Sequence, residues 1–471
     1  MRPILVILAL VGLLSTAACD PKPCPGQTVI PGTDVTAALT SALATASATP
    51  ISGPVGPSGA PVGRVYLGPG EYRFKSITVP DNVRIEISPG ATLRAVDGYE
   101  PNANNDWGLF VFGTDGDPTR NVTVTSGDGC GGLGTPTSTN KPSNTNFRGN
   151  DPAVVRTSGG QQVLGMANAP VPFRPEWDTS AMWVMDLDPQ LTNAGEQVTG
   201  FFFRWAYDVD VSNVFTIQNA SRTAAGIGPI DGDTSRTVAM MFDPPNDTDW
   251  TPVVEDQKIP HRISVRNHYN ILSPSGQGAN QIRACRDCTF ESIFSHGGVP
   301  LRVETDGIRA ESGTCAGTGV NGEGFKEFAI VDGLQATRIE GAYGNRVAMF
   351  TPHCLPNGSA TVNQVRGTSM GELVIIAARD SGSLSGGFSA ISITGVQGCG
   401  GALAQEPHPA QNSYLPKPSR AAVSIEPTNP PLPVTLAGAW SWPAPPNSGG
   451  LPDGILPSAH GATITHPNNC T

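Results

Sequence analysis

A short stretch of alternating charged and apolar residues, GGVPLRVETD at positions 297–306, is the part of the chain best suited to chemistry. As a β-strand, it places Arg302, Glu304 and Asp306 on one face and the intervening apolar residues on the other. Alternate residues of a strand lie about 6.5–7 Å apart at Cα. Carboxyl groups at that spacing match an inverting glycosidase, whose acid and base stand roughly 6.5–9.5 Å apart to admit a water. An ordinary solvated strand face has the same pattern, so this stretch alone does not establish catalysis.

A second polar group lies about one repeat earlier in the chain. Gln281 precedes Glu304 by 23 positions, from 281 to 304, and a coil of short strands takes about that length. We therefore predict that Gln281 lies beside Glu304 on the neighbouring strand, and Arg283 beside Asp306. With Arg302, this arrangement gathers two guanidinium groups that can bind a sulfate or a carboxylate.

The composition favours many short strands separated by turns, because the 471 residues include 56 glycines and 44 prolines and only 15% are charged. Short alternating strands are predicted along most of the chain, and from position 263 they begin roughly every 25–40 residues. Examples lie at 64–67, 83–87, 122–124, 209–211, 263–265, 288–290, 329–331 and 391–393. A solenoid explains how so long a chain lacks a linker between domains, since it grows by adding coils.

The first elements indicate which solenoid this is. From Asp34, with Thr33 or Asp34 as cap, apolar residues recur at helical spacing. They are Val35, Ala38, Leu39, Ala42, Leu43 and Ala46. GRVYLGPGEYRF (63–74) and ITVPDNVRIEISPGATL (77–93) follow. This order resembles the opening of the pectin-lyase-like proteins, whose right-handed parallel β-helix is capped by an amphipathic helix.

That resemblance implies an all-β fold, a right-handed parallel β-helix with an N-terminal capping helix. A cap is needed because an open solenoid end exposes apolar core and strand edges. We expect the β-helix to occupy residues 28–404. The Pro-rich residues 405–471 are expected to form a C-terminal cap or covering loops.

The N-terminus has the pattern of an export signal. Arg2 is the only charge before an apolar run at 4–14, and small residues follow, so residues 1–18 are predicted to be a signal peptide. Cys19 directly after two alanines matches a lipoprotein signal, in which the cysteine is lipidated. We therefore expect an exported protein that is lipid-anchored at the cell surface. Ordinary cleavage after Ala18, which gives a soluble secreted protein, is the alternative.

The cysteines favour disulfides. Beyond Cys19 there are eight, an even number in an exported chain, and their pairing cannot be deduced from sequence. They are Cys24, Cys130, Cys285, Cys288, Cys315, Cys354, Cys399 and Cys470. The Cys285-x-x-Cys288 pattern also occurs in redox and metal sites, but no second such pair or histidine pair adjoins it, so no metal is expected there.

The charge of −11 argues against a nucleic-acid partner, and it requires that an anionic substrate meet a local gathering of basic residues. No cofactor is expected to be required. Structural calcium is one option, with Asp115 and Asp117 or Asp231 and Asp233 as candidate ligands. Both pairs also match ordinary turns. We expect a monomer that meets a membrane only through its lipid anchor.

At GQGANQIRACRDCTFESIFSHGGVPLRVETD, residues 276–306, the chain resembles the core of the iota-carrageenases, glycoside hydrolase family 82. The resemblance is strongest over residues 208–356. It implies hydrolysis of a sulfated galactan, with Glu304 as the general acid, Asp306 as the general base and Gln281 holding the attacking water.

The resemblance extends to two further residues. A histidine in a later Pro-His pair of the family corresponds to His353, and an arginine that faces the substrate corresponds to Arg302. Gly307 to Gly324 is an insertion that lengthens the distance to His353, and His296 is a rival for its role. A turn residue before two glycines is the plainer interpretation of His296.

The expected roles carry an electrostatic condition. Glu304 must be protonated to act as an acid, and repulsion from Asp306 favours that form. Arg283 beside Asp306 would keep the base ionised. Arg302 instead favours the ionised form of Glu304, so an anionic group of the substrate has to neutralise it. Unsulfated galactans are therefore predicted to be poor substrates.

Three other functions stay open. A polygalacturonase-like hydrolase has adjacent aspartates, a Gly-His-Gly and an Arg-Ile-Lys, none of which occurs here. A polysaccharide lyase requires a cluster of calcium-binding carboxylates and a base near a uronate, and it leaves the E-x-D pair unexplained. A non-catalytic β-helix that binds surface glycans would tolerate loss of both carboxylates.

Overall fold

The computed structural model describes the greater part of a long parallel sheet. The described residues are 25–96, 108–114, 116–130, 155–158, 161–164, 181–187, 199–218, 238–243, 258–305, 330–342, 344–351, 357–376, 388–400, 423–425, 434–437, 439–441 and 463–465. Cys19, Asp231, Asp233, Asp306 and His353 lie outside them, and so does Asp115.

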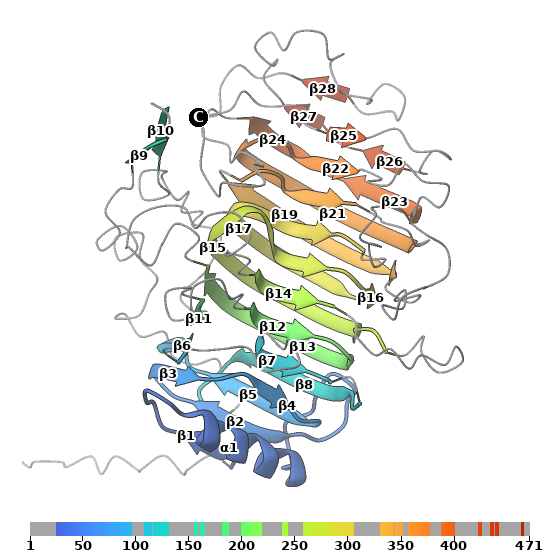
Figure 1. Ribbon diagram of the computed structural model, residues 1–471. Helices are drawn as coiled ribbons and strands as arrows, with labels where there is room; N and C mark the ends of the chain where they lie inside the picture. Colours follow the sequence, from blue (N-terminus) through green and yellow to red (C-terminus); the bar gives the residue numbers. More distant parts are fainter. Residues whose placement is uncertain are drawn as a thin grey trace, which may run out of the picture.

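Among the described residues, twenty-four strands form one sheet, and their pairings within it are parallel (Figure 1). The predicted right-handed parallel β-helix is therefore confirmed. Each coil has three sides, which we call faces A, B and C in the order in which the chain passes through them.

Face A contains β1 (Gln27–Val29), β2 (Gly63–Leu67), β5 (Val83–Ile87), β8 (Thr119–Ser126), β23 (Phe388–Thr394) and β26 (Val434–Ala437). Face B contains β3 (Gly70–Phe74), β6 (Ala91–Ala95), β11 (Trp183–Asp186) and β24 (Gln397–Gly400). Face C contains β4 (Ile77–Val79), β7 (Gly108–Phe112), β12 (Thr199–Phe203), β14 (Val238–Phe242), β20 (Ala348–Phe350), β22 (Val374–Ile376) and β25 (Val423–Ile425).

Longer strands bend around the corners and take part in more than one face. They are β13 (Ala206–Ile217), β15 (His261–Ile282), β17 (Thr289–Val303), β19 (Leu334–Ala342) and β21 (Asn357–Met370). The short strands β16 (Cys285–Arg286) and β18 (Val331–Asp332) pair just before face A. Two separate pairs are β9 (Val155–Ser158) with β10 (Gln161–Leu164), and β27 (Ala439–Ser441) with β28 (Thr463–Thr465).

A single left-handed residue makes the bend between faces A and B in successive coils. The φ angles at this corner lie between 52° and 63°. The residues are Asn213, Asn267, Ser292, Arg338, Gln364 and Gly395. Asn267 Nδ2 also donates to Asn213 Oδ1 (3.0 Å), so neighbouring corners are tied together. Asparagine is suited to this place because it tolerates the left-handed region better than most residues.

The N-terminal end is covered by α1 (Thr36–Ala48), as predicted (Figure 1). Leu39, Ala42, Leu43 and Ala46 are buried, whereas Ala38 is exposed. The cap position differs from the prediction, because Val35 holds it without a side-chain hydrogen bond. Asp34 still contributes, since its carboxylate accepts from the Thr36 amide at 3.0 Å.

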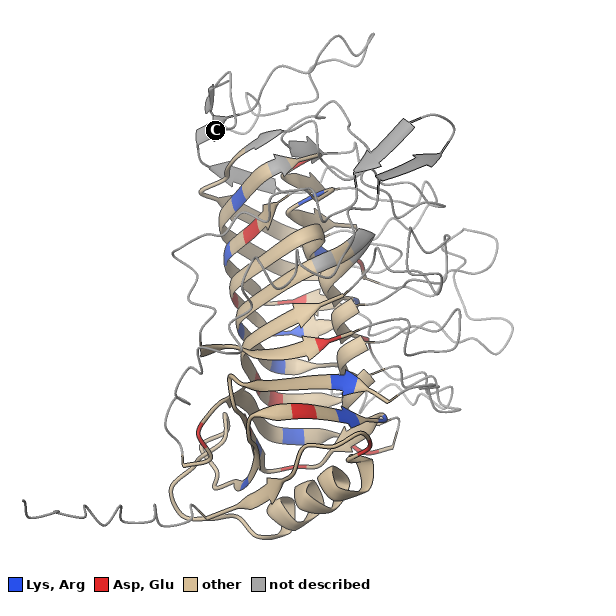
Figure 2. Ribbon diagram, turned by 90° about the vertical axis from the view of Figure 1, so that its left-hand side faces the viewer, with Lys and Arg blue, Asp and Glu red and all other residues tan. Residues whose placement is uncertain are grey.

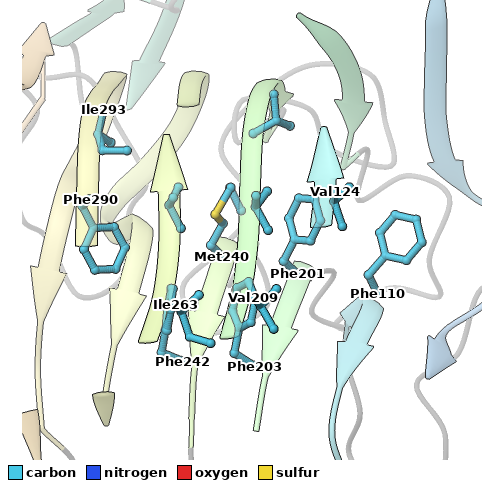
Figure 3. Packing of buried hydrophobic residues seen from close by; sticks show 14 of the residues in the cluster. Phe110, Val124, Phe201, Phe203, Val209, Met240, Phe242, Ile263, Phe290 and Ile293 are labelled. Atoms are coloured by element: carbon cyan, nitrogen blue, oxygen red, sulfur yellow. The ribbon is translucent and has the colours of Figure 1, made fainter. Parts of the chain in front are cut away.

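Aromatic side chains fill the interior of the coils. Phe110, Phe201, Phe203, Phe242 and Phe290 lie between the faces and are fully buried (Figure 3). The Phe203 and Phe242 rings stack with their centroids 4.5 Å apart, from one coil to the next. These ring contacts connect the interiors of successive coils.

The Cys285-x-x-Cys288 pattern forms a disulfide. Both residues are buried at the turn that leads from face C back to face A. Their thiols are therefore used in this bond rather than as metal ligands. Within the described residues, no group of three or more His, Cys, Asp or Glu side chains is placed to hold a metal ion.

The region predicted as a C-terminal cap contains two strands that continue the sheet. β25 pairs with β22, and β26 pairs with β23. The bounds predicted for the β-helix and for the Pro-rich region stay a prediction. Among the described residues, no helix has both the length and the apolar character needed to cross a membrane.

Candidate functional site

The predicted alternation at the end of β17 is present as far as the described chain extends. Leu301 and Val303 are buried in the core of the coil. Arg302 and Glu304 lie on the opposite, outer side of face C, where each side chain is only 11% exposed. Arg302 Nη2 and Glu304 Oε2 form an ion pair. Two opposite charges are thus held together on an outer surface that is largely shielded from water.

The predicted register of Gln281 is wrong. Gln281 pairs with Arg302, and the Glu304 amide donates to the carbonyl of Ile282 at 2.9 Å. Continuing that register, Arg283 is in line with Glu304, not with Asp306. Two adjacent positions along face C therefore carry Gln281 beside Arg302 and Arg283 beside Glu304.

The physical reason is an unequal corner. On faces A and B, β15 and β17 pair with an offset of 25 residues, as at Asn270 and Ser295. On face C the offset is 21, as at Gln281 and Arg302. Eight positions separate Asn270 from Gly278 in β15, and four separate their partners Ser295 and Val299 in β17. Four extra residues in the corner of β15 shift only the part of the coil that follows them.

Gln281 and Arg302 lie in a row of outward side chains in which their neighbours on both sides are apolar. Met241, Gln281, Arg302, Met349 and Ile375 occupy equivalent positions on successive coils. Met241 packs with Val111, Phe202 and Val238, and Met349 and Ile375 pack with Val299. The two polar residues are therefore bounded along the row by apolar groups on both sides.

Gln281 is 3% exposed, and its Oε1 accepts no hydrogen bond from the part of the chain that the structure describes. A buried amide oxygen without a donor is costly. It is therefore an available acceptor for a donor brought by a ligand or a water. This observation agrees with the water-holding role that the family resemblance implies for Gln281.

The structure adds Asp243, which sequence reasoning missed. Asp243 Oδ2 lies 3.0 Å from Arg283 Nη1, and Arg283 is 28% exposed. Asp243 directly follows β14, as Glu304 directly follows β17. The strand registers bring Asp243, Arg283 and Glu304 into line on three successive coils, so the charges alternate from acidic to basic to acidic. The signal was the charged residue after the apolar run at 238–242, but 40 residues separate the Asp243 and Arg283 positions.

The remaining predicted residues are placed only in part. Asp306 and His353 lie outside the described residues. Thr351, two positions before His353, donates its amide to the Val303 carbonyl at 2.8 Å. Thr351 is therefore in line with Glu304 on the next coil. His296 lies on face B, where it pairs with Ala342, and not on face C with Glu304. Burial lowers the pKa of His296 to about 4.

Chemically, the described part of the site offers two carboxyl groups, one buried amide and two guanidinium groups. Both arginines contact carboxylates, Arg302 on Glu304 and Arg283 on Asp243. An anionic ligand would therefore compete with these carboxylates for the guanidinium groups. Such competition would change the charge around Glu304.

The chain is similar to known proteins in sequence and in fold, although no family model matches it. An iota-carrageenase of Zobellia galactanivorans is 28% identical over 106 residues, which are 22% of this chain. The aligned part spans about a fifth (19%) of that relative's length.

Two solved structures cover almost the whole chain. A family 82 iota-carrageenase from A. fortis, in the absence of chloride ions, aligns with 94% of this chain and 88% of its own, with a TM-score of 0.57 and 14% identity. An iota-carrageenase complexed to iota-carrageenan fragments aligns with 95% and 89%, with a TM-score of 0.56 and 14% identity. At this identity the structural likeness establishes the fold. The chain thus resembles the iota-carrageenases, locally in its sequence and over nearly its whole length in its fold.

Proposed function

We propose that this protein is a glycoside hydrolase that cleaves a sulfated galactan, with the β-1,4 linkages of iota-carrageenan as its substrate. The observation that carries the proposal is the Arg302–Glu304 ion pair beside Gln281, on the outer side of face C. It occurs in a chain that is similar to iota-carrageenases in sequence and fold.

In this mechanism Glu304 gives its proton to the glycosidic oxygen as the bond from that oxygen to the anomeric carbon breaks. A water attacks the anomeric carbon from the opposite side of the ring, and Asp306 takes a proton from it. Gln281 and His353 hold that water. The configuration inverts, and proton exchange with solvent returns both carboxyl groups to their starting states. The buried Oε1 of Gln281, which can accept from a water, supports this arrangement.

The substrate itself activates the acid. In the free protein Arg302 is paired with Glu304, and that pairing favours a carboxylate that cannot donate a proton. A substrate sulfate that binds Arg302 removes this stabilisation, and Glu304 then takes up a proton. Sulfation should therefore raise kcat as well as lower KM. Arg283, held by Asp243, binds a second anionic group.

Export completes the proposal. Residues 1–18 act as the signal, and Cys19 carries the lipid that anchors the mature protein at the cell surface. The support is the sequence pattern at the N-terminus. The mature chain acts as a monomer without a required cofactor. Structural calcium has limited support, since Asp117 accepts from the Thr114 amide (2.8 Å) through its backbone carbonyl, as in an ordinary turn.

The experiment is a reducing-end assay on the purified protein with iota-, kappa- and lambda-carrageenan, agarose and polygalacturonate. Glu304→Gln and Asp306→Asn are compared with Glu291→Gln, an exposed glutamate earlier on β17. We expect release of reducing ends from iota-carrageenan, loss in the first two variants by about 10²–10⁴-fold, and wild-type activity in the third. NMR of the first product should show the α-anomer.

Each other outcome has a definite meaning. Unsaturated products would identify a lyase. Cleavage of another glycan that depends on Glu304 and Asp306 would retain the site and change the substrate. Binding of a glycan without cleavage would identify a non-catalytic module. Full activity in Glu304→Gln would refute the assignment of the acid.

A further inference from the structure

The pairing between β15 and β17 is irregular at the corner between faces B and C. Before the corner, His268 pairs with Ile293, and after it, Asn280 pairs with Leu301. The register shifts twice in between, at Ser273 and again before Gly278. Regular pairing therefore does not carry the alignment of face B through to face C.

Two buried polar side chains connect the segments across this corner. His268 and Asn280 are fully buried, and His268 Nδ1 lies 3.3 Å from Asn280 Oδ1. Asn280 Nδ2 donates to the Pro300 carbonyl on β17 at 3.0 Å. On the other side of the ring, Nε2 lies 2.8 Å from the hydroxyl of Thr216 on β13. We call the His268–Asn280 contact the clip.

The clip lies on the inner side of the coil. Asn280 pairs with Met240 and Leu301, both core residues, while Gln281 points outward. A slip of one residue would reverse the two sides and is excluded by the core. A slip of two residues preserves the alternation, so the apolar pattern does not oppose it. Such a slip would remove Asn280 from both His268 and Pro300 and leave buried polar groups unsatisfied.

Buried polar contacts of this kind contribute specificity more than stability, as a single buried asparagine fixes register in coiled coils. Here the residue that is fixed is Asn280, and its chain neighbour is Gln281. The Pro300 carbonyl that Asn280 binds lies two residues before Arg302. The clip therefore holds both strands that carry the outward pair Gln281 and Arg302.

We propose that His268 is a positioning residue, which acts through Asn280 to set the register and height of Gln281 beside Arg302. This inference rests on the proposed function, because it assigns His268 a role in that same site. His268 does not touch the substrate, since it is buried inside the coil.

The test compares three changes at the clip. His268→Leu with Asn280→Leu replaces both polar groups by apolar ones, which is often tolerated in a core. His268→Asn places an amide N–H where Nδ1 was, and His268→Gln places it where Nε2 was. The control is Ser212→Val with Thr125→Val, which removes a buried hydroxyl pair (2.8 Å) between β13 and β8.

Two properties are measured, kcat on iota-carrageenan and amide hydrogen exchange of residues 278–282 against 261–266. We expect the double leucine variant to fold, to lose about 10²-fold in kcat, and to exchange faster only at 278–282. His268→Asn should stay close to the wild type, and the control should match it in both measurements.

Wild-type kcat and exchange in the double leucine variant would overturn the proposal. If that variant does not fold, the test rests on the single variants His268→Asn and His268→Gln. Equal kcat values for these two variants would also overturn the proposal. The exchange measurement needs no substrate. If the wild type cleaves no galactan, the proposed function fails. The role of the clip is then judged by hydrogen exchange alone, and it is rejected if residues 278–282 exchange equally slowly in the double leucine variant and in the wild type.

Discussion

The part of face A formed by β13 and β15 and the outer side of face C carry the same kinds of ion pair in different surroundings. On face A, Arg262 pairs with Asp208 and Arg266 with Asp210, and the arginine side chains are 54% and 46% exposed. On face C, Arg302 and Glu304 are each 11% exposed. Figure 2 shows acidic and basic residues recurring on successive coils, so charge alone does not distinguish the site.

The difference lies in what surrounds each pair. An exposed pair is screened by water and contributes about 0–1 kcal/mol. A shielded pair interacts more strongly, and removing one partner leaves a charge that is costly to keep from water. The two face A pairs between β13 and β15 therefore serve as solvated links between coils. The face C pair interacts more strongly, because little water screens it.

Of the comparisons between the two faces, the largest difference in activity should come from replacing Arg302 on face C and Arg266 on face A, one at a time, by lysine. Arg302→Lys keeps the charge but loses the planar fork that binds a carboxylate or a sulfate through two hydrogen bonds. We expect kcat/KM on iota-carrageenan to fall by about 10–100-fold, since hydrogen bonds between charged groups are worth roughly 1.5–3 kcal/mol. Arg266→Lys should leave it unchanged. Equal effects of the two changes in steady-state kinetics would remove the distinction between the faces.

A smaller effect is expected from removing the Asp243 carboxylate beside the second arginine. Asp243→Asn removes a negative charge that lies 3.0 Å from Arg283, so the positive charge of Arg283 acts more strongly beside Glu304. Because that charge favours the ionised acid, we expect kcat to fall by about tenfold, equivalent to roughly 1.4 kcal/mol. The matched change on face A, Asp208→Asn, should have no effect on kcat. A change confined to KM would mean that Asp243 positions Arg283 for binding alone.

Acid should act on the histidines buried on face B and not on the arginine pairs between β13 and β15 on face A. Burial lowers the pKa of His268 to about 4 and that of His296 to about 4, from 6.5. Above pH 6.5 both are neutral whether folded or unfolded. Between 6.5 and 4 only the unfolded chain takes up these protons, so the free energy of unfolding falls as pH falls.

Each histidine contributes a slope of about 1.4 kcal/mol per pH unit in that window, and none below it. Urea unfolding between pH 7 and 4 measures the slope. His268→Asn should lower the slope of the free energy of unfolding against pH by the contribution of one histidine. Arg262→Gln on face A should leave that slope unchanged. The comparison with the wild type cancels the carboxylates common to both proteins. An unchanged slope in His268→Asn would show that His268 is protonated while folded.

Local pattern predicted what local geometry determines. The alternation of Arg302, Val303 and Glu304 predicted their two sides correctly, because successive side chains of a strand always alternate. The helical spacing from Val35 to Ala46 predicted α1 for the same kind of reason. Neither prediction required knowledge of any distant residue.

Register between coils was predicted less well, because it depends on every residue between the two strands. The offset of 23 from Gln281 to Glu304 was close to a coil length. The four extra residues in the corner of β15 changed face C alone. The long segment between Asp243 and Arg283 hid their contact in the same way. The clip was missed because a buried polar pair inside a solenoid has no periodic signature.

The smallest effect should be the coupling within a face A pair. In a double-mutant cycle with Arg266→Ala and Asp210→Ala, we expect an interaction energy of about 0.2–1 kcal/mol from thermal or urea unfolding. Salt at about 1 M should reduce it further, because screening then acts over roughly 3 Å. A coupling of about 3 kcal/mol or more would mean that water does not weaken the pair despite the 46% exposure of Arg266. The contrast between faces A and C would then have to rest on Gln281 and its buried amide rather than on the strength of the ion pairs.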